Sequence, residues 1–399
     1  AGVYNYDTNV QGGRLGGLLS LRNTLVADVQ TNLNSLASEI VQQVNQYHVQ
    51  GLGSEGSFTQ LVGWTMASTN LVDFSPAVTD GNIYLRVTNT STGVVTRNAV
   101  AVDASADSLS TLATAISAIT GVSASVNSSK LTISADASYK FDFLPAVLSA
   151  PTASTLTETT PPTITVSGIY TGTQNDTFRF TISGAGSVSN GTLQLQVKDN
   201  SGAGNVIATL SIGSGYAAGD RLDVGNGITV SLGAGDFGAG DNFDIDAFAD
   251  TDTTGVLAGA GINTFFSGTT AAGMAVRSEI TNSPGRIATA LGGDLTDNTN
   301  ALRMVGIKNQ TFSNLDSMTA QEYYRQLVTD IGTVISGKKT REDNIEIMMH
   351  ELTSQQNDLS GVNINDEAAK LLLFEQMFKA MAKYMNAIQS SLSTVMEII

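Results

Sequence analysis

The sequence predicts a multidomain α+β protein, with a helical-bundle or coiled-coil stem formed by both ends of the chain and β-rich domains inserted between them. Apolar residues near both ends recur at spacings of three and four, which is the period of an amphipathic helix. In the middle, apolar residues alternate with polar ones, as they do in half-buried strands. Segments rich in Gly, Pro, Ser and Thr separate these patterns and indicate boundaries.

The changes of pattern divide the 399 residues into six expected parts. A chain of this length is long enough for more than one domain. The parts are 1–60, the N-terminal part of the helical stem; 61–147, an α+β insertion; 148–163, a linker; 164–250, an all-β insertion; 251–362, a return segment and helical stem; and 363–399, a C-terminal helix expected to drive assembly.

A long helix is expected over residues 14–49, and Gly51, Gly53 and Gly56 end it. Two interpretations stay open for this helix: an ordinary amphipathic core helix, or a coiled-coil-like partner for another helix. Its apolar residues, mostly three or four apart, are Leu15, Leu18, Val26, Val29, Leu33, Leu36, Ile40, Val44 and Tyr47.

The first insertion is expected to be a β-β-α-β-β unit over about residues 80–143. Ile83, Leu85 and Val87 alternate with polar residues, and later pairs of apolar residues do the same. Between the two strand pairs, residues 105–119 carry their apolar side chains on one helical face. This order of elements is typical of a small α+β domain.

The second insertion is expected to be an all-β sandwich or barrel. A linker precedes it, because residues 148–163 contain Pro151, Pro161 and Pro162 among many Ser and Thr residues. Short strands separated by Gly, Asn and Asp are typical of a sandwich or a barrel. The candidate strands are 165–170, 176–183, 192–199, 206–212, 228–232 and 242–248.

Helical patterns return after the second insertion. A short helix is expected at 297–308. Thr319 and Glu322 have the spacing of a capping box and open a long helix. Lys338 and Arg341 fall on the apolar seam of that helix, so the helix is either interrupted near them or polar on that face.

The C-terminal helix carries an unbroken heptad pattern, with alternating gaps of three and four. Asn363 or Asn365 can cap its start, and Asp366 and Glu367 place negative charge at the positive end of the helix dipole. A seam of this kind must be buried against another part of the chain or against another molecule. We call these residues the assembly seam: Leu371, Phe374, Phe378, Met381, Met385, Ile388, Leu392, Val395 and Ile399.

The charge balance and the composition argue against several classes of partner and site. The chain has 36 acidic and 20 basic residues, and its net charge is therefore 20 − 36 = −16. Such a chain repels phosphate backbones, so no nucleic-acid partner is expected. It has no Cys, which rules out disulfides and thiolate metal sites. Residues 255–276 carry no charge, but their Gly, Thr, Ser and Asn content argues against a membrane span.

No residue pattern indicates catalysis. His48 and His350 are far apart in the sequence and belong to no recognisable catalytic motif. Residues 233–241 faintly resemble a calcium-binding β-roll repeat, but a pair of Gly/Asp turns explains them better. We therefore expect no catalytic, cofactor-binding or metal-binding residues, no cofactor and no enzymatic activity.

Two stretches of the C-terminal helix carry a resemblance to a known group of proteins. Residues 362–369 (VNINDEAA) and 373–383 (LFEQMFKAMAK) resemble the C-terminal motif of the bacterial flagellar rod, hook and hook-associated proteins. That motif occurs here with Glu375, Phe378 and Met381 in place of the usual Gln, Tyr and Ser. The departures at Phe378 and Met381 make the seam more apolar without changing its spacing.

The N-terminal helix narrows the resemblance to the hook-associated proteins of the FlgK type. The matching stretches are residues 12–19 (GGRLGGLL), Leu36-Ala37 and residues 44–51 (VNQYHVQG), and residues 297–302 (DNTNAL) are similar to a further segment of that family. The family begins with a helical segment that pairs with the C-terminal helix. We do not find this segment here and expect that it is missing either because the sequence covers only part of the chain or because the protein is processed.

The resemblance implies a structural role at the junction between the flagellar hook and filament. It implies export through the flagellar type III system without a cleaved signal peptide, and an extracellular position in the bacterial flagellum. The implied partners are further copies of the chain in a helical or ring assembly, the hook protein and the second junction protein. The C-terminal helix is where an export chaperone would bind, and no membrane partner is implied.

Two alternatives stay open. The first is another protein of the same class, the hook protein or flagellin, although residues 45–51 argue against both. The second is a secreted carbohydrate-binding adhesin or enzyme that uses the β domain at 164–250.

Overall fold

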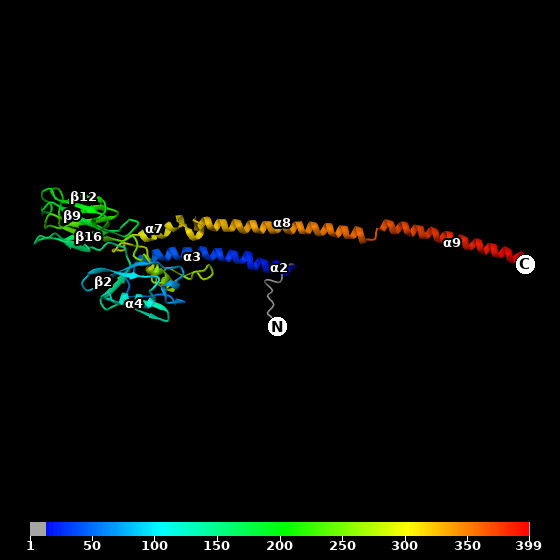
Figure 1. The fold of residues 1–399 in the computed structure, drawn as a ribbon, viewed down its shortest axis with the longest axis horizontal. Coiled ribbons are helices and arrows are strands. Elements are labelled where there is room, and N and C mark those ends of the chain that lie inside the picture. Colours follow the sequence, from blue (N-terminus) through cyan, green and yellow to red (C-terminus); the bar gives the residue numbers. More distant parts are fainter. Residues whose placement is uncertain (1–12, 399) are drawn as a thin grey trace. The chain divides into compact units, whose positions relative to one another are not determined.

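The computed structural model describes residues 13–398 of the chain (Figure 1). Gly12 of the N-terminal motif and Ile399 of the assembly seam lie outside this range. The chain divides into two units, residues 1–327 and residues 328–399, and each is described by itself. The described part is a mixed α+β protein with helices at both ends and several β-sheets between them, as the sequence predicted.

The first unit opens with the helix that the sequence predicted, although one turn of it is wider than an α-helix. The helix consists of α2 (Gly13–Ser20), a π-helical turn η1 (Leu21–Val26) and α3 (Ala27–Gln50). Its second half is a core helix, because Val41 and Val49 are buried there. Its first half leaves large apolar side chains exposed.

Two three-stranded antiparallel sheets and one helix form the first β-containing part, with strand orders β3-β2-β6 and β1-β5-β4. The predicted β-β-α-β-β order is confirmed, with β1 and β6 in addition. The elements are β1 (Gln60–Val62), β2 (Gly81–Asn89), β3 (Val95–Val102), α4 (Leu109–Ser117), β4 (Val122–Asn127), β5 (Lys130–Ala135) and β6 (Tyr139–Asp142).

The core of this part is completed by a segment from much later in the chain. The short helix α5 (Val256–Gly259) places Val256 and Leu257 in the same cluster as the buried faces of β2 and β5, with no exposed surface on either side chain. A separate second core begins at Val147 and holds the following strands.

The second core lies between a five-stranded sheet, of order β12-β11-β9-β16-β7, and a three-stranded sheet, of order β13-β14-β8. The stacked rings of Phe180 and Phe243, 4.7 Å apart, join β9 to β16 inside it. The strands are β7 (Ala153–Thr155), β8 (Ile164–Gly168), β9 (Asp176–Ser183), β10 (Gly186–Ser187), β11 (Gln194–Lys198), β12 (Val206–Ser211), β13 (Arg221–Gly225), β14 (Ile228–Leu232), β15 (Asp236–Phe237) and β16 (Asn242–Ala247).

The segment 148–163, expected to be a linker, is held against the second β part. Its strand β7 pairs with β16, and the Thr157 hydroxyl donates a hydrogen bond to the Asp241 carboxylate at 2.7 Å. Pro162 is buried. The sequence did not predict this strand, because a short edge strand with exposed polar side chains shows no apolar alternation.

The return segment ends the first unit. The predicted helix at 297–308 is confirmed as α7 (Thr299–Gly306), followed by one turn of 3₁₀-helix, η5 (Ile307–Asn309). The other elements are β17 (Phe266–Ser267), β18 (Ala275–Val276), α6 (Ser278–Asn282), η4 (Pro284–Arg286), β19 (Thr311–Phe312), η6 (Ser313–Leu315) and β20 (Met318–Thr319).

The long helix α8 (Ala320–Ser360) begins in the first unit. The predicted capping box is confirmed, because Thr319 N donates to Glu322 Oε2 at 3.0 Å and Glu322 N donates to Thr319 Oγ1 at 3.2 Å. The Tyr323 hydroxyl bonds to Asn32 of α3 at 3.1 Å, and Leu327 is buried. The first two turns of α8 therefore pack against the N-terminal helix.

The second unit contains the rest of α8 and the helix α9 (Ile364–Ile398). Helix α8 runs without interruption through Lys338 and Arg341, so its seam is polar there. The Asn363 side chain accepts a hydrogen bond from Asn365 N at 3.0 Å, as expected of a cap. Among the described helices, none combines the length and the apolar character that crossing a membrane requires.

Candidate assembly site

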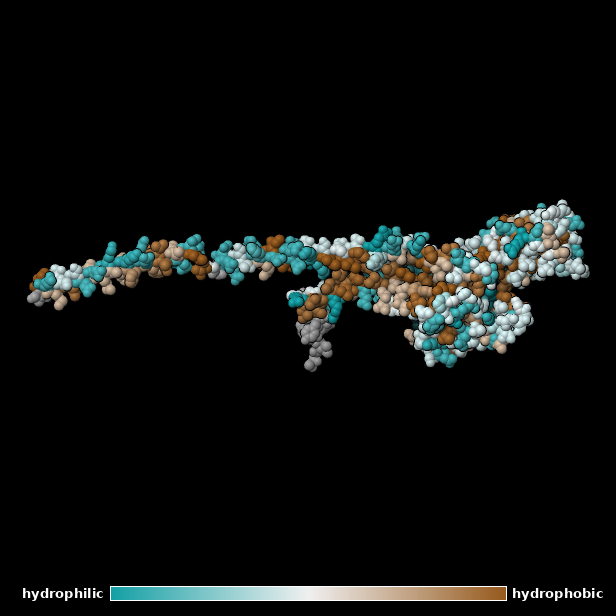
Figure 2. Space-filling model, turned by 180° about the vertical axis from the view of Figure 1, so that it is seen from behind, coloured by the Kyte–Doolittle hydropathy of each residue, from teal (hydrophilic) through white to brown (hydrophobic). Residues whose placement is uncertain are grey.

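The assembly seam forms a stripe of exposed apolar side chains along α9. Its eight described members have exposed fractions between 45% at Ile388 and 75% at Phe378. Figure 2 shows such hydrophobic side chains, in brown, alternating with hydrophilic ones, in teal, along α8 and α9. Their spacing places them on one face, because residues three and four apart are neighbours on a helix.

The far end of the seam has the shape of a coiled-coil hole. Ile388, Ser391, Leu392 and Val395, at positions i, i+3, i+4 and i+7, surround a shallow hollow that Tyr384 borders. Four residues in this arrangement receive one apolar side chain of a facing helix in knobs-into-holes packing. The surface of α9 is therefore ready to pack against a second helix.

Burying this stripe would release a large free energy. A fully buried Leu, Ile, Met or Phe side chain contributes ~1.5–3 kcal/mol, so eight seam residues contribute on the order of 10–20 kcal/mol before the entropy cost of association. A gross value of this size would be enough to order the helix if another helix covered the stripe.

Residues 44–51 comprise the last turns of α3 and its C-cap Gly51. In the first unit, Asn45 and His48 of this stretch and Asn263 and Asn300 of the return segment form a group that we call the polar clamp. Asn45 begins it: its side-chain oxygen accepts hydrogen bonds from Phe265 N at 3.0 Å and Phe266 N at 2.9 Å, and its amide donates to Phe266 O at 3.1 Å. The side chain thus bonds to the backbone of a segment some 220 residues later in the chain. This fixes the return segment to α3.

His48 is a fully buried, neutral member of the same clamp. Its Nδ1–H donates to Asn263 O at 2.7 Å, and its Nε2 accepts from Ala288 N at 3.1 Å. Burial lowers the pKa of His48 from 6.5 to about 4. A proton added at Nε2 would face the Ala288 N–H, so the site holds the imidazole neutral.

Two asparagines of the return segment complete the clamp. The amide of Asn263 donates to the carbonyls of His48, Val49 and Gly51 at 3.2–3.3 Å and so satisfies the C-terminal end of α3. The amide of Asn300 donates to Tyr47 O at 2.9 Å. Residues 297–302 therefore lie beside residues 44–51, although nearly the whole β-rich part of the chain separates them in sequence.

The close contact at the end of α3 explains its glycines. A Cβ on Gly51 would lie 2.2 Å from the Asn300 amide nitrogen, and one on Gly53 would lie 2.0 Å from Gly285 O. Next to them the Arg303 guanidinium lies 4.7 Å above the Tyr47 ring, a cation–π contact. The sequence indicated only that these glycines end the helix.

The two histidines lie in different surroundings. His48 is hydrogen-bonded to backbone groups, and His350 lies on the exposed surface of α8. In the described part of the chain, no group of three or more His, Cys, Asp or Glu side chains is placed to hold a metal ion. The 233–241 segment forms hydrogen-bonded turns, in which Gly238 N donates to Asp241 at 2.7 Å.

The first unit thus contains the clamp, and the second unit carries the exposed seam on α9. Residues 2–61 match the family described as the flagellar hook-associated protein FlgK helical domain. The match includes residues 12–19 and 44–51 and confirms the resemblance seen there.

The solved structures that are similar to the chain include a FlgK and a FlgL. The flagellar hook junction protein FlgK from Burkholderia pseudomallei is 15% identical, with a TM-score of 0.30, and the match covers 89% of this chain and 64% of that one. FlgL from Xanthomonas campestris is 14% identical, with a TM-score of 0.20, and the match covers 52% of this chain and 56% of that one. The chain thus spans less than two thirds of the length of either protein. No curated protein matches the chain.

The neutral state of His48 predicts a pH dependence of stability. The folded protein binds fewer protons at His48 than the unfolded chain does between pH 6.5 and about 4. The contribution of His48 to the free energy of unfolding is therefore complete above pH 6.5, and it falls by ~3 kcal/mol as the pH drops to about 4. We expect the free energy of unfolding of the wild type to lose its excess over that of His48→Gln as the pH falls through this range. Denaturant unfolding of both proteins measures this difference.

Asp252 also titrates in this pH range, so the effect of His48 must be taken from the difference between the free energies of unfolding of the two proteins. Burial raises the pKa of Asp252 from 3.8 to about 6, so its contribution falls as the pH rises through 6, opposite to that of His48. Subtracting the His48→Gln curve from the wild-type curve removes this opposing slope. A difference that stays constant with pH would contradict the buried neutral state of His48.

Proposed function

We propose that the chain is a structural protein of the bacterial flagellum, a junction adaptor that polymerises between the hook and the filament through its terminal helices. The observation that carries this proposal is the bare apolar seam of α9 in a chain with a FlgK-type helical domain at residues 2–61. The solved relative named as a hook junction protein is compatible with this role.

The exposure of the apolar seam supports a role in assembly. The described residues of α9 are without exception exposed, including the large apolar ones. Monomeric proteins rarely keep so continuous an apolar surface in water. Contacts between unlike faces of identical subunits extend into rings or helical assemblies, so a helix of this kind suits a polymer.

The proposal includes the partners and the location. The chain contacts further copies of itself, the hook protein and the second junction protein, and the seam binds an export chaperone before assembly. It leaves the cell through the flagellar type III system without a cleaved signal peptide and stays in the extracellular flagellum. It acts without enzymatic activity, and the β domains at 61–147 and 164–250 are carried as insertions.

Electron microscopy of flagella labelled with gold-conjugated antibody against the β domains tests this proposal. We expect the label in a narrow band at the distal end of the hook. Label along the whole hook would instead identify a hook protein, and label along the filament would identify a flagellin. Label on the cell surface away from flagella would favour an adhesin and overturn the proposal.

A further inference from the structure

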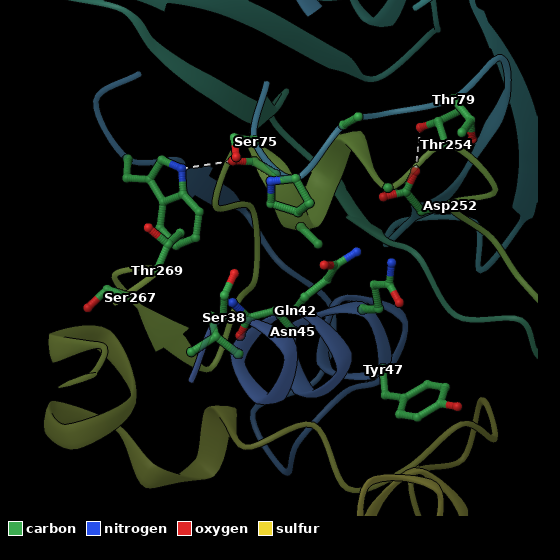
Figure 3. Close-up of a pocket in the computed structure, with 18 of the residues that line it drawn as sticks. Ser38, Gln42, Asn45, Tyr47, Ser75, Thr79, Asp252, Thr254, Ser267 and Thr269 are labelled. Carbon is green, nitrogen blue, oxygen red and sulfur yellow. Dashed lines mark hydrogen bonds between the residues drawn. The ribbon is translucent and has the colours of Figure 1, made fainter. Parts of the chain in front are cut away.

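The first unit contains a cavity of about 600 Å³ beside the clamp. This volume lies within the range of roughly 300–1,000 Å³ that small-molecule sites occupy. Its walls come from α3, from residues 64–79 and from residues 250–269. Figure 3 shows Ser38, Gln42 and Asn45 on the helix, facing Ser75 and Thr254 across the open space.

The helix wall of the cavity presents free amides. Gln42 and Gln46 lie one turn apart on α3, and both line the cavity. Both are half-buried, and neither side-chain amide is hydrogen-bonded to another described residue. Each amide offers two donors and an acceptor, so the wall can bond groups that both donate and accept. Asn45 is already committed to the clamp.

The opposite wall contains two carboxylates that already accept hydrogen bonds from the protein. Asp252 is buried and accepts from Thr254 Oγ1 at 2.6 Å and from Leu257 N at 2.8 Å. Asp250 accepts from the Gln50 amide at 2.8 Å. The Gln50 side-chain oxygen, by contrast, is buried and has no partner among the described residues. A buried acceptor of this kind calls for a donor such as a hydroxyl group.

An indole ring supplies the apolar surface. Trp64 donates its ring N–H to Gly259 O at 2.8 Å, and a Cβ on Gly261 would lie only 2.5 Å from the ring, so one face of the indole rests on the Gly261 backbone. The side chain is half-buried and lines the cavity beside Met66 and Pro76. The ring is therefore held rigidly with its remaining surface toward the open space.

The charges of the cavity disfavour anionic ligands. Two carboxylates, Asp250 and Asp252, line it against a single guanidinium, that of Arg303, which lies over the Tyr47 ring. Such a wall repels phosphates and carboxylates. Most of the other lining side chains carry hydroxyl or amide groups, which suits a ligand with many neutral polar groups.

We propose that this cavity binds a neutral carbohydrate. The apolar face of a pyranose ring lies against Trp64, as a flat apolar body suits an aromatic ring. The hydroxyl groups of the sugar bond to the amides of Gln42 and Gln46 and donate to the unpartnered side-chain oxygen of Gln50. This site lies outside the 164–250 β domain and is independent of the proposed role in the flagellum.

The chain offers a direct reporter, because Trp64 is its single tryptophan. The experiment titrates the whole protein with glucose, galactose, N-acetylglucosamine and their β-linked disaccharides while the tryptophan fluorescence is recorded. We expect at least one sugar to change the fluorescence in a saturable way and to reduce its quenching by acrylamide. Sorbitol, an acyclic polyol, should have no saturable effect.

Two neighbouring glutamines give a matched pair of variants. Gln42→Ala removes an amide from the cavity and should weaken binding roughly three- to tenfold, as one neutral hydrogen bond allows. Gln43→Ala, whose amide bonds instead to Glu39 at 2.9 Å, should bind like the wild type. The proposal is overturned if no sugar saturates, if sorbitol reproduces the effect, or if Gln42→Ala binds as tightly as Gln43→Ala.

Discussion

Replacing Phe378 with Asp in the complete protein should abolish its incorporation at the hook tip, and with it filament growth and swimming. Phe378 lies near the middle of the assembly seam with 75% of its side chain exposed. An unpaired carboxylate buried there on assembly costs several kcal/mol, on the order of the 2–5 kcal/mol known for unsatisfied buried charges. Motility and electron microscopy of cells that carry the variant measure the effect.

Gln376→Asp is the matched control for this variant. It adds the same carboxylate to the same helix two residues away, on the face opposite the seam in the heptad. Cells with this variant should swim normally. In both variants the first unit should keep its β-sheet signal and its melting transition, because residue 378 belongs to the other unit. Normal filaments with Phe378→Asp would refute the role of the seam.

Gly53→Ala should destabilise the first unit by about 3 kcal/mol, a cost typical of overpacking a well-packed site. The new Cβ would lie 2.0 Å from Gly285 O and 2.6 Å from Ile287 O. Both atoms belong to the backbone, so no side chain can rotate to make room. Denaturant unfolding of the variant measures the loss directly.

Gly17→Ala provides the control for the glycine substitution. Gly17 lies in α2, and a Cβ added there meets nothing within 4 Å. Alanine is favoured over glycine inside a helix by roughly 0.5–1 kcal/mol, so this variant should be neutral or slightly more stable. Equal stability of the two alanine variants would contradict the close packing of residues 51–53 against the return segment.

Residue periodicity predicted the long elements well, because their patterns are local. Strands such as β2 and β9 alternate over eight or nine residues, and α9 repeats over whole heptads. The elements that were missed are short: β7 has three residues and α5 has four. Such segments are too short to show a period, and tertiary contacts alone fix them.

In the candidate site, too, the local features could be predicted from the sequence and the long-range contacts could not. The assembly seam was visible because consecutive residues of one helix define it. The clamp was not, because Asn45 and His48 bond to backbone groups more than 200 residues away. Only the resemblance to the FlgK type drew attention to residues 44–51. The cavity was also missed, because its lining residues, such as Gln42 and Thr254, are far apart in the sequence.

Burial of the seam on assembly can be measured directly in a chain that has no native cysteine. Met385→Cys places a thiol on the seam, and Lys383→Cys places one on the opposite face of the same helix. The measurement is maleimide labelling of each variant as free protein and in assembled flagella. We predict that both thiols react in the free protein and that only the thiol at residue 385 becomes protected on assembly. Equal labelling of the two thiols in assembled flagella would contradict the seam as the assembly surface.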